Sequence, residues 1–193
     1  MTSTKAIRVP AQKQYLLYEA VLDFIQERKP GVLVIEGEIA AGKSTLANEL
    51  SSRVISMDDF YLPADRQPLD VCKEPGSHMD LARFQEEVLR SLHRETLTYQ
   101  AFDCRKQEYT DKRLLSGECT LIEGNYAMMS CLGDYFDEAI FLEVSPELQK
   151  IRLQQRNGWD GYRRFSTRWI PASERYFAAE FVRERCGMRF IIE

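Results

Sequence analysis

The segment at residues 37–44 constrains the fold of this chain more than any other part of its sequence. Its letters, GEIAAGKS, separate a glycine from a Gly-Lys-Ser triplet by four residues, shortly after the apolar run at residues 32–35. Such a loop between a strand and a helix turns backbone N–H groups inward, where they and the helix N-terminus can hold a phosphate group. The sequence therefore predicts a phosphate-binding loop. The alternative is an ordinary strand-turn-helix corner whose glycines only relieve backbone strain.

The positions of this loop have distinct expected roles. The Lys43 ammonium group should reach the β- and γ-phosphates of a nucleotide, and the Ser44 hydroxyl should join the ligands of a Mg²⁺ ion. Glu38 is unusual in such a loop, and its carboxylate should point away from the anion because like charges repel. The predicted nucleotide-binding residues are Gly37, Glu38, Ile39, Ala40, Ala41, Gly42, Lys43, Ser44 and Thr45.

Apolar runs alternate with helical patterns along the rest of the chain. Strands are predicted at residues 32–36, 53–57, 119–122, 139–143 and 188–192, and helices at 15–25, 43–50, 81–93 and 146–156. This order predicts an α/β fold with a five-stranded parallel sheet, helices on both faces, and ligands outside the carboxyl ends of the strands. Residues 62–76 contain three prolines and predict a long functional surface loop.

Composition and charge argue against several classes of function. A chain of 193 residues with 44% hydrophobic content predicts a single domain spanning residues 1–193. The net charge of -4 argues against nucleic acid as a partner, although arginines gather between residues 152 and 168. Five cysteines without paired metal-ligand spacing predict free thiols in a reducing compartment. Because no signal-peptide pattern and no apolar run of about 18 residues occurs, we expect a cytoplasmic protein without a membrane partner.

Acidic residues follow two of the predicted strands. Asp58 comes directly after the strand at residues 53–57, on the same edge of the sheet as the phosphate loop. An acid there can accept a proton from an attacking hydroxyl group, so Asp58 is predicted as a catalytic base. Glu123 follows the strand at 119–122 and is predicted to order Mg²⁺, as a Walker B acid does. The alternatives are a turn or helix cap at Asp58 and a simple strand end at Glu123.

Three short segments accompany the phosphate loop: DDFY at residues 58–61, YQAFDC at 99–104 and IEG at 122–124. Together these motifs resemble the uridine kinase and phosphoribulokinase family of P-loop kinases, in particular small bacterial proteins described as uridine kinase-like. The resemblance covers residues 15–192, with further matching segments at 74–80, 134–137, 152–158, 169–171 and 174–177. It implies a P-loop NTPase fold with a small helical lid at about residues 152–170.

The resemblance also implies roles for single residues. Asp58 takes the position of the family's catalytic acid, and Arg152 and Arg156 take those of lid arginines that neutralise charge on the transferred phosphate. The aromatic-Asp pair that contacts the nucleoside in the family corresponds to Phe102-Asp103, with Tyr99 as the competing aromatic residue. The implied catalytic residues are Asp58, Lys43 and Arg156, and the implied substrate-binding residues are Tyr61, Asp80, Tyr99, Phe102, Asp103 and Arg152.

The implied activity is transfer of the γ-phosphate of ATP, with Mg²⁺, to a hydroxyl group of a small metabolite. The first candidate is the 5'-hydroxyl of a nucleoside such as uridine or cytidine. One alternative is a kinase for another small acceptor, such as nicotinamide riboside, pantothenate or a sugar acid. The other is a nucleotide-binding ATPase or switch module. Homo-oligomers occur among such kinases, and the sequence leaves self-association open.

The chain departs from the family pattern in two places. Pyrimidine nucleoside kinases carry a histidine shortly after the aromatic-Asp pair, whereas this chain has CRKQ at residues 104–107. A third lid arginine is replaced by NGW at 157–159, which leaves Arg163 or Arg164 to supply that charge. Of the two histidines, His78 lies in a matched loop and is a candidate for contact with the substrate, whereas His93 ends a predicted helix as a surface residue.

Overall fold

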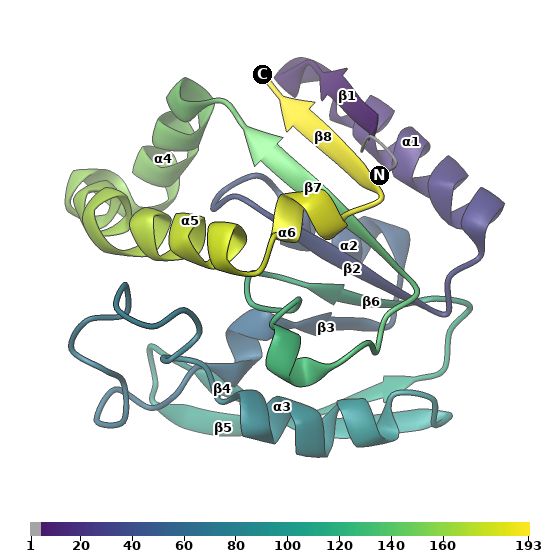
Figure 1. Cartoon of the computed structure of the whole chain (residues 1–193), viewed down its shortest axis with the longest axis horizontal. Helices are drawn as coiled ribbons and strands as arrows, with labels where there is room; N and C mark the ends of the chain where they lie inside the picture. Colours follow the sequence, from purple (N-terminus) through teal and green to yellow (C-terminus); the bar gives the residue numbers. More distant parts are fainter. Residues whose placement is uncertain (1–4) are drawn as a thin grey trace.

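The computed structural model describes residues 5–193 and contains a main sheet of six parallel strands (Figure 1). Their spatial order is β1-β8-β7-β2-β6-β3. The strands are β1 (Lys5–Val9), β2 (Val32–Gly37), β3 (Val54–Ser56), β6 (Thr120–Glu123), β7 (Glu138–Val144) and β8 (Met188–Ile192). The α/β class with a parallel sheet is therefore confirmed, but the predicted number of five strands is wrong.

The additional strand is β1, which pairs in parallel with β8 at the edge of the sheet. Its sequence KAIRV contains no continuous apolar run, because an edge strand needs only part of its surface buried. Ile7 and Val9 face the protein, whereas Arg8 forms an exposed ion pair with Glu193. Figure 1 shows β1 beside the C-terminal strand β8.

Helices cover both faces of the sheet, as predicted. On one face, α1 (Gln14–Arg28) and α2 (Lys43–Leu50) pack against Leu33 and Ile35 of β2. On the other face, α3 (Leu81–Glu87), α5 (Ile170–Ala179) and α6 (Val182–Arg185) belong to a core that includes Val32 and Val34. Because successive side chains of a strand point to opposite faces, an unbroken apolar strand such as β2 serves two cores.

The helical segment after β7 is longer than the sequence predicts. Helix α4 spans Pro146–Arg164, and Gly158 interrupts it with φ 69° and ψ -177°. A π-helical turn, η5 (Phe165–Trp169), then leads into α5. Figure 1 shows α4 and α5 as an arm beside the sheet. The predicted lid at about residues 152–170 falls on this arm, and its closing movement stays a prediction.

The segment between β3 and β6 forms a second layer that the sequence does not predict fully. It contains η2 (Met57–Phe60), α3, η3 (Leu89–Ser91) and an antiparallel hairpin of β4 (Thr96–Asp103) and β5 (Glu108–Leu115). The predicted helix at 81–93 ends at Glu87 and continues as η3. Strand β5 is almost entirely exposed, and its polar sequence EYTDKRLL lacks the apolar signal of a buried strand.

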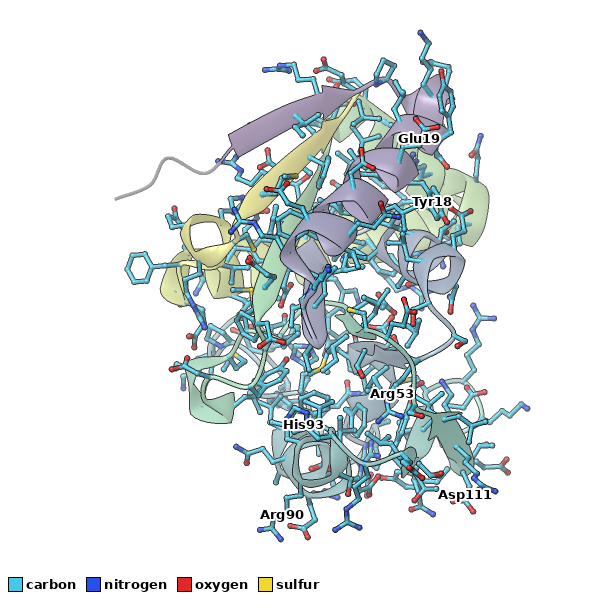
Figure 2. All side chains as sticks on the ribbon, turned by 90° about the vertical axis from the view of Figure 1, so that its right-hand side faces the viewer. Tyr18, Glu19, Arg53, Arg90, His93 and Asp111 are labelled. Atoms are coloured by element: carbon cyan, nitrogen blue, oxygen red, sulfur yellow. The ribbon has the colours of Figure 1, made fainter. Side chains whose placement is uncertain are left out.

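Arg53 joins this second layer to the main sheet. Its side chain is 2% exposed, and it donates hydrogen bonds to Thr120 Oγ1 (2.9 Å), Leu92 O (2.9 Å) and Arg94 O (3.0 Å). Figure 2 shows Arg53 inside the molecule, whereas Asp111 lies on the outer side of the β4–β5 hairpin. A guanidinium group suits this place because its donors spread in a plane and can reach several carbonyl groups.

All five cysteines are free thiols in the structure. None of the helices within residues 5–193 combines the length and the apolar character that crossing a bilayer requires.

Candidate active site

A cavity of about 710 Å³ lies where β2, β3 and β6 end. Residues 39–45 line it after β2, Asp58 and Tyr61 line it after β3, and residues 123–126 line it at the end of β6. Parallel strands present their carboxyl ends on one edge of a sheet, which is why residues far apart in the sequence meet here.

The phosphate loop has the backbone conformation that its glycines allow. Gly37 has φ 149° and approaches β7 so closely that an added Cβ atom would lie 2.3 Å from Leu142 O. Gly42 precedes α2 with φ 102°. The Lys43 Nζ atom donates hydrogen bonds to Gly37 O (2.7 Å) and Glu38 O (2.9 Å). The lysine side chain therefore folds back over its own loop. Both hydrogen bonds must break before its ammonium group can contact a phosphate.

Glu38 points away from the cavity. Its Oε2 atom accepts a hydrogen bond from Val144 N (3.0 Å), and its Oε1 atom lies 3.2 Å from an Arg183 nitrogen. Arg183 also pairs with Glu174 at 3.0 Å. Of the predicted nucleotide-binding positions, Gly37 and Glu38 shape the loop from behind, and residues 39–45 face the cavity.

The charged groups of the cavity lie close enough to influence one another. Burial raises the pKa of Asp58, whereas the nearby Lys43 opposes this shift. Burial likewise raises the pKa of Glu123, which is 3% exposed and accepts a hydrogen bond from Ser56 Oγ (2.5 Å). Burial lowers the pKa of Lys43, and Glu123 is the leading carboxylate that counteracts this. The Lys43 ammonium group thus lies among carboxylates in a partly desolvated part of the cavity.

The oxygen donors at this place fit a Mg²⁺ ion. Ser44 lies near enough to Glu123 to lower the pKa of its carboxyl, and Asp58 lies near enough to raise it. No group of three or more histidine, cysteine, aspartate or glutamate side chains that could hold a metal occurs in the described part of the chain. Mg²⁺ does not require one, since it is usually bound by one or two carboxylates together with substrate phosphates and water.

Both predicted lid arginines line the cavity. Arg152 Nη1 donates to Ala40 O (2.9 Å) and Ala41 O (3.2 Å), so it supports the phosphate loop. Arg156 donates from Nε to Asn157 Oδ1 (2.9 Å) and is exposed. Arg156 is therefore the freer of the two to approach a transferred phosphate.

Four predicted substrate-binding residues lie outside the cavity lining, and the first two act locally. Asp80 caps α3 by accepting a hydrogen bond from Arg83 N (3.2 Å). Tyr99 donates its hydroxyl proton to Asp59 Oδ2 (2.8 Å) and is 3% exposed. Their polar groups already have partners within the second layer.

The other two belong to the β4–β5 hairpin. Phe102 is 4% exposed and packs on Tyr109, with ring centroids 5.0 Å apart. Asp103 Oδ1 accepts hydrogen bonds from the backbone nitrogens of Arg105 (2.8 Å) and Lys106 (3.2 Å), which fixes the hairpin turn. The structure does not bring Asp80, Tyr99, Phe102 or Asp103 to the cavity, and their substrate contacts stay predictions.

The cavity extends from the β1 and β8 side of the sheet to the β3 and β6 side, and different residues line its two ends. On the side of β1 and β8, Val9, Gln14, Leu17 and Ile192 line it, none of which the sequence singles out. The sequence patterns do not predict β1, and for this reason they do not point to these residues either. Val9 ends that strand, and α1 follows shortly after it.

On the side of β3 and β6, the lining includes residues from three separate segments. They are His78, Asn125, Tyr126, Trp169 and Ser173. Their only sequence signal is that most of them fall in or beside segments shared with the resembling family. Because Asp58 lies on this side too, we call it the acceptor end of the cavity.

Comparisons with solved structures decide the fold. A possible uridine kinase from Bacillus stearothermophilus aligns with a TM-score of 0.73 and 19% identity, covering 92% of this chain and 99% of that one. A candidate fructose transport system kinase from Silicibacter sp. TM1040 aligns with a TM-score of 0.65 and 26% identity, covering 91% and 97%. The chain has the P-loop kinase fold. No protein-family model matches the chain, and no curated protein matches it significantly.

Within this P-loop kinase fold, Glu36 is a buried carboxyl group directly before the phosphate loop. It is 0% exposed, and its Oε1 atom accepts hydrogen bonds from Tyr176 Oη (2.5 Å) and Met128 N (3.3 Å). Its Oε2 atom has no partner among the described residues. Burial raises the pKa of Glu36 to about 7, although the hydrogen bond from Tyr176 opposes this shift.

We expect the Glu36→Gln variant to have a different pH dependence of stability. Because the native pKa lies above the ordinary value of 4.5, folding takes up a proton between pH 4.5 and about 7. The free energy of unfolding of the unmodified protein should therefore fall as pH rises through this window. Between pH 4.5 and pH 8, the free energy of unfolding of the variant should rise by on the order of 3 kcal/mol relative to that of the unmodified protein. One pKa unit corresponds to about 1.4 kcal/mol.

Urea denaturation at several pH values measures this difference. A Glu27→Gln variant provides the control, because Glu27 is an exposed carboxyl group on α1. The control should give a profile parallel to that of the unmodified protein. Parallel profiles for Glu36→Gln as well would show that Glu36 has no shifted pKa.

Proposed function

We propose that the protein is an ATP- and Mg²⁺-dependent kinase that transfers the γ-phosphate to a hydroxyl group of a small metabolite. The first candidate acceptor is a nucleoside, such as uridine or cytidine, phosphorylated at its 5'-hydroxyl. One observation carries this proposal: Asp58, Lys43 and the phosphate loop line a single cavity of about 710 Å³ that extends beyond the loop to Tyr61, His78 and Trp169. A switch or simple ATPase would need only the nucleotide end.

The proposed reaction assigns a role to each charged side chain. Asp58 accepts the proton of the acceptor hydroxyl as that oxygen attacks the γ-phosphorus, and the bond between the γ-phosphorus and the leaving ADP oxygen breaks. A raised pKa suits this role, because a base works best when its pKa approaches the working pH. Lys43 contacts the β- and γ-phosphates, and Arg156 approaches the transferred group.

Ser44 and Glu123 are the residues that would hold a magnesium ion. When bound, Mg²⁺ neutralises charge on the nucleotide phosphates and so favours the transfer. The remaining contribution comes from alignment, because phosphoryl transfer depends mainly on bringing acceptor, phosphorus and leaving oxygen into line.

A sugar is the second candidate acceptor. The structure with 26% identity belongs to a protein described as a candidate fructose transport system kinase. The P-loop kinase fold serves both a possible uridine kinase and this protein, so the fold supports phosphoryl transfer without choosing between the two acceptors.

Coupled measurement of ADP release tests the proposal. The assay contains ATP, Mg²⁺ and one acceptor at a time: uridine, cytidine, nicotinamide riboside, pantothenate, fructose or a sugar acid. We expect release that depends on one class of acceptor and that disappears when Lys43 is replaced by Met. ATP hydrolysis that no small acceptor changes, but that another protein stimulates, would instead identify a switch or ATPase module.

A further inference from the structure

His78 combines complete burial with unused hydrogen-bonding capacity. Its side chain is 0% exposed, and both ring nitrogens lack a hydrogen-bond partner among the described residues. Asn125 Oδ1, on the segment that follows β6, is also buried without a partner among these residues. Other orphan atoms of this kind occur in the core and second layer, but His78 and Asn125 are the ones that line the cavity. Buried polar groups are normally satisfied, so these atoms point to a missing ligand.

The surroundings of His78 hold its ring in a fixed position. Tyr61 stacks on the imidazole, with centroids 5.5 Å apart and an interplanar angle of 25°. Tyr126 and Trp169 meet it edge to face at 4.8 and 5.2 Å. The backbone is fixed as well, because Leu62 N donates to His78 O at 2.9 Å. These neighbours offer flat apolar surfaces and leave the ring nitrogens as the polar part of the pocket.

The side chain of Asn125 is equally constrained. Asn125 donates from Nδ2 to Ser173 Oγ (2.8 Å), and Ser173 in turn donates to Trp169 O (2.9 Å). These bonds fix the amide group and leave its Oδ1 atom, which can only accept a hydrogen bond, without a partner among the described residues. The polar groups that this part of the lining offers a ligand therefore include the His78 ring nitrogens and the Asn125 Oδ1 atom.

His78 should be neutral at physiological pH. Burial lowers the pKa of His78 to about 4, and the positive charge of Arg168 acts in the same direction. A neutral imidazole carries one N–H donor and one acceptor nitrogen. Because the two nitrogens point in different directions, one of them can bond a ring ligand, either as donor or as acceptor.

We propose that one ring nitrogen of His78 forms a hydrogen bond with the ring of the phosphate acceptor, while Asn125 Oδ1 accepts another from the same ligand. The ligand class is an uncharged ring compound with neighbouring donor and acceptor groups, which is the chemistry of a nucleobase edge and of sugar hydroxyls alike. Aromatic residues contact the flat face of either kind of ring. The inference rests on the proposed function, because Asp58 marks this end of the cavity as the acceptor end.

Binding without turnover tests the inference separately from the kinase activity. Long-range ¹H–¹⁵N NMR spectra report the protonation and hydrogen bonding of imidazole nitrogens at pH 7, and His93 is the only other histidine of the chain. His93 is exposed at the end of η3, where Figure 2 labels it, and serves as the internal reference. We expect added uridine or fructose to shift the His78 ring signals and leave those of His93 unchanged.

The two ligands distinguish the sources of this chemistry. A shift with uridine alone supports nucleobase recognition, and a shift with fructose alone supports sugar recognition. If neither compound moves the His78 signals, the inference is wrong, and buried water alone occupies these nitrogens. If His78 responds but no ADP is released, the proposed kinase function fails, while ring binding at His78 stands.

Kinetics of two variants provide the second measurement. We expect His78→Leu to raise the KM for the effective acceptor by about 30-fold, as loss of buried hydrogen bonds typically does, with little change in the KM for ATP. His78→Gln retains a donor and an acceptor and should restore part of the loss. A His93→Gln control should match the unmodified protein. An acceptor KM that is unchanged in both folded His78 variants would overturn the inference.

Discussion

The Asp58→Asn variant should lose phosphoryl transfer while retaining ATP binding. General-base catalysis contributes about 100- to 10,000-fold in enzymes, so we expect a fall in kcat of about 1,000-fold. Asparagine has nearly the same shape as aspartate but cannot accept the proton of the acceptor hydroxyl. The Kd for ATP should change by no more than about twofold, since the phosphate loop and Lys43 remain in place. Single-turnover kinetics and nucleotide titration measure the two quantities.

The neighbouring carboxyl group provides a matched control. Asp59 Oδ2 accepts hydrogen bonds from Tyr99 Oη (2.8 Å) and Lys112 Nζ (2.8 Å), and it does not line the cavity. Asp59→Asn should therefore weaken the second layer but leave kcat within about threefold of normal. Full turnover by the Asp58→Asn variant would show that Asp58 is not the catalytic base. Equal losses in both variants would indicate a general effect of charge on this loop.

The Gly37→Ala variant should have the largest effect on stability. At this position φ is 149°, and an added Cβ atom would lie 2.3 Å from Leu142 O and 2.7 Å from Leu142 N. Both contacts are with the backbone of β7, so no side chain can move aside. Overpacking and an unfavourable φ together should reduce the free energy of unfolding by about 3 kcal/mol or more. Separation of β2 from β7 should also disturb the phosphate loop and weaken ATP binding.

Gly133→Ala separates the clash from backbone strain. Gly133 also has a positive φ, 75°, but an added Cβ atom would meet nothing within 4 Å. Only the conformational cost applies there, and we expect a loss of about 1 kcal/mol. Urea denaturation curves of both variants measure the difference. If the two variants were equally stable, the close approach of β2 and β7 would not be the reason that residue 37 is a glycine.

Much of the fold follows from local patterns in the sequence. The strands β2, β6, β7 and β8 are marked by apolar runs, and the phosphate loop by its glycines and Lys43. The rule that acids at the ends of parallel strands share one edge placed Asp58 and Glu123 beside that loop, and both line the cavity. Their catalytic and metal-binding roles stay predictions.

Other features have no local signal. Strand β1 is short and its apolar residues are interrupted by Arg8, and strand β5 is largely polar, so neither contains the continuous apolar run that marks a buried strand. The pair Phe102-Asp103 matches a family motif. In the structure, however, the Asp103 carboxylate accepts hydrogen bonds within the hairpin turn, and the Phe102 ring packs against Tyr109. A motif specifies residue types, but the turn in which they lie decides where they point.

The sequence by itself determined the α/β class, the phosphate loop and the acids that follow the strands, because these depend on periodicity and on chemistry within a few residues. Only the tertiary structure decided which side chains form the acceptor end. His78, Asn125 and Trp169 come from three segments separated by dozens of residues. Their meeting depends on strand order and on the paths of long loops, which short-range patterns do not encode.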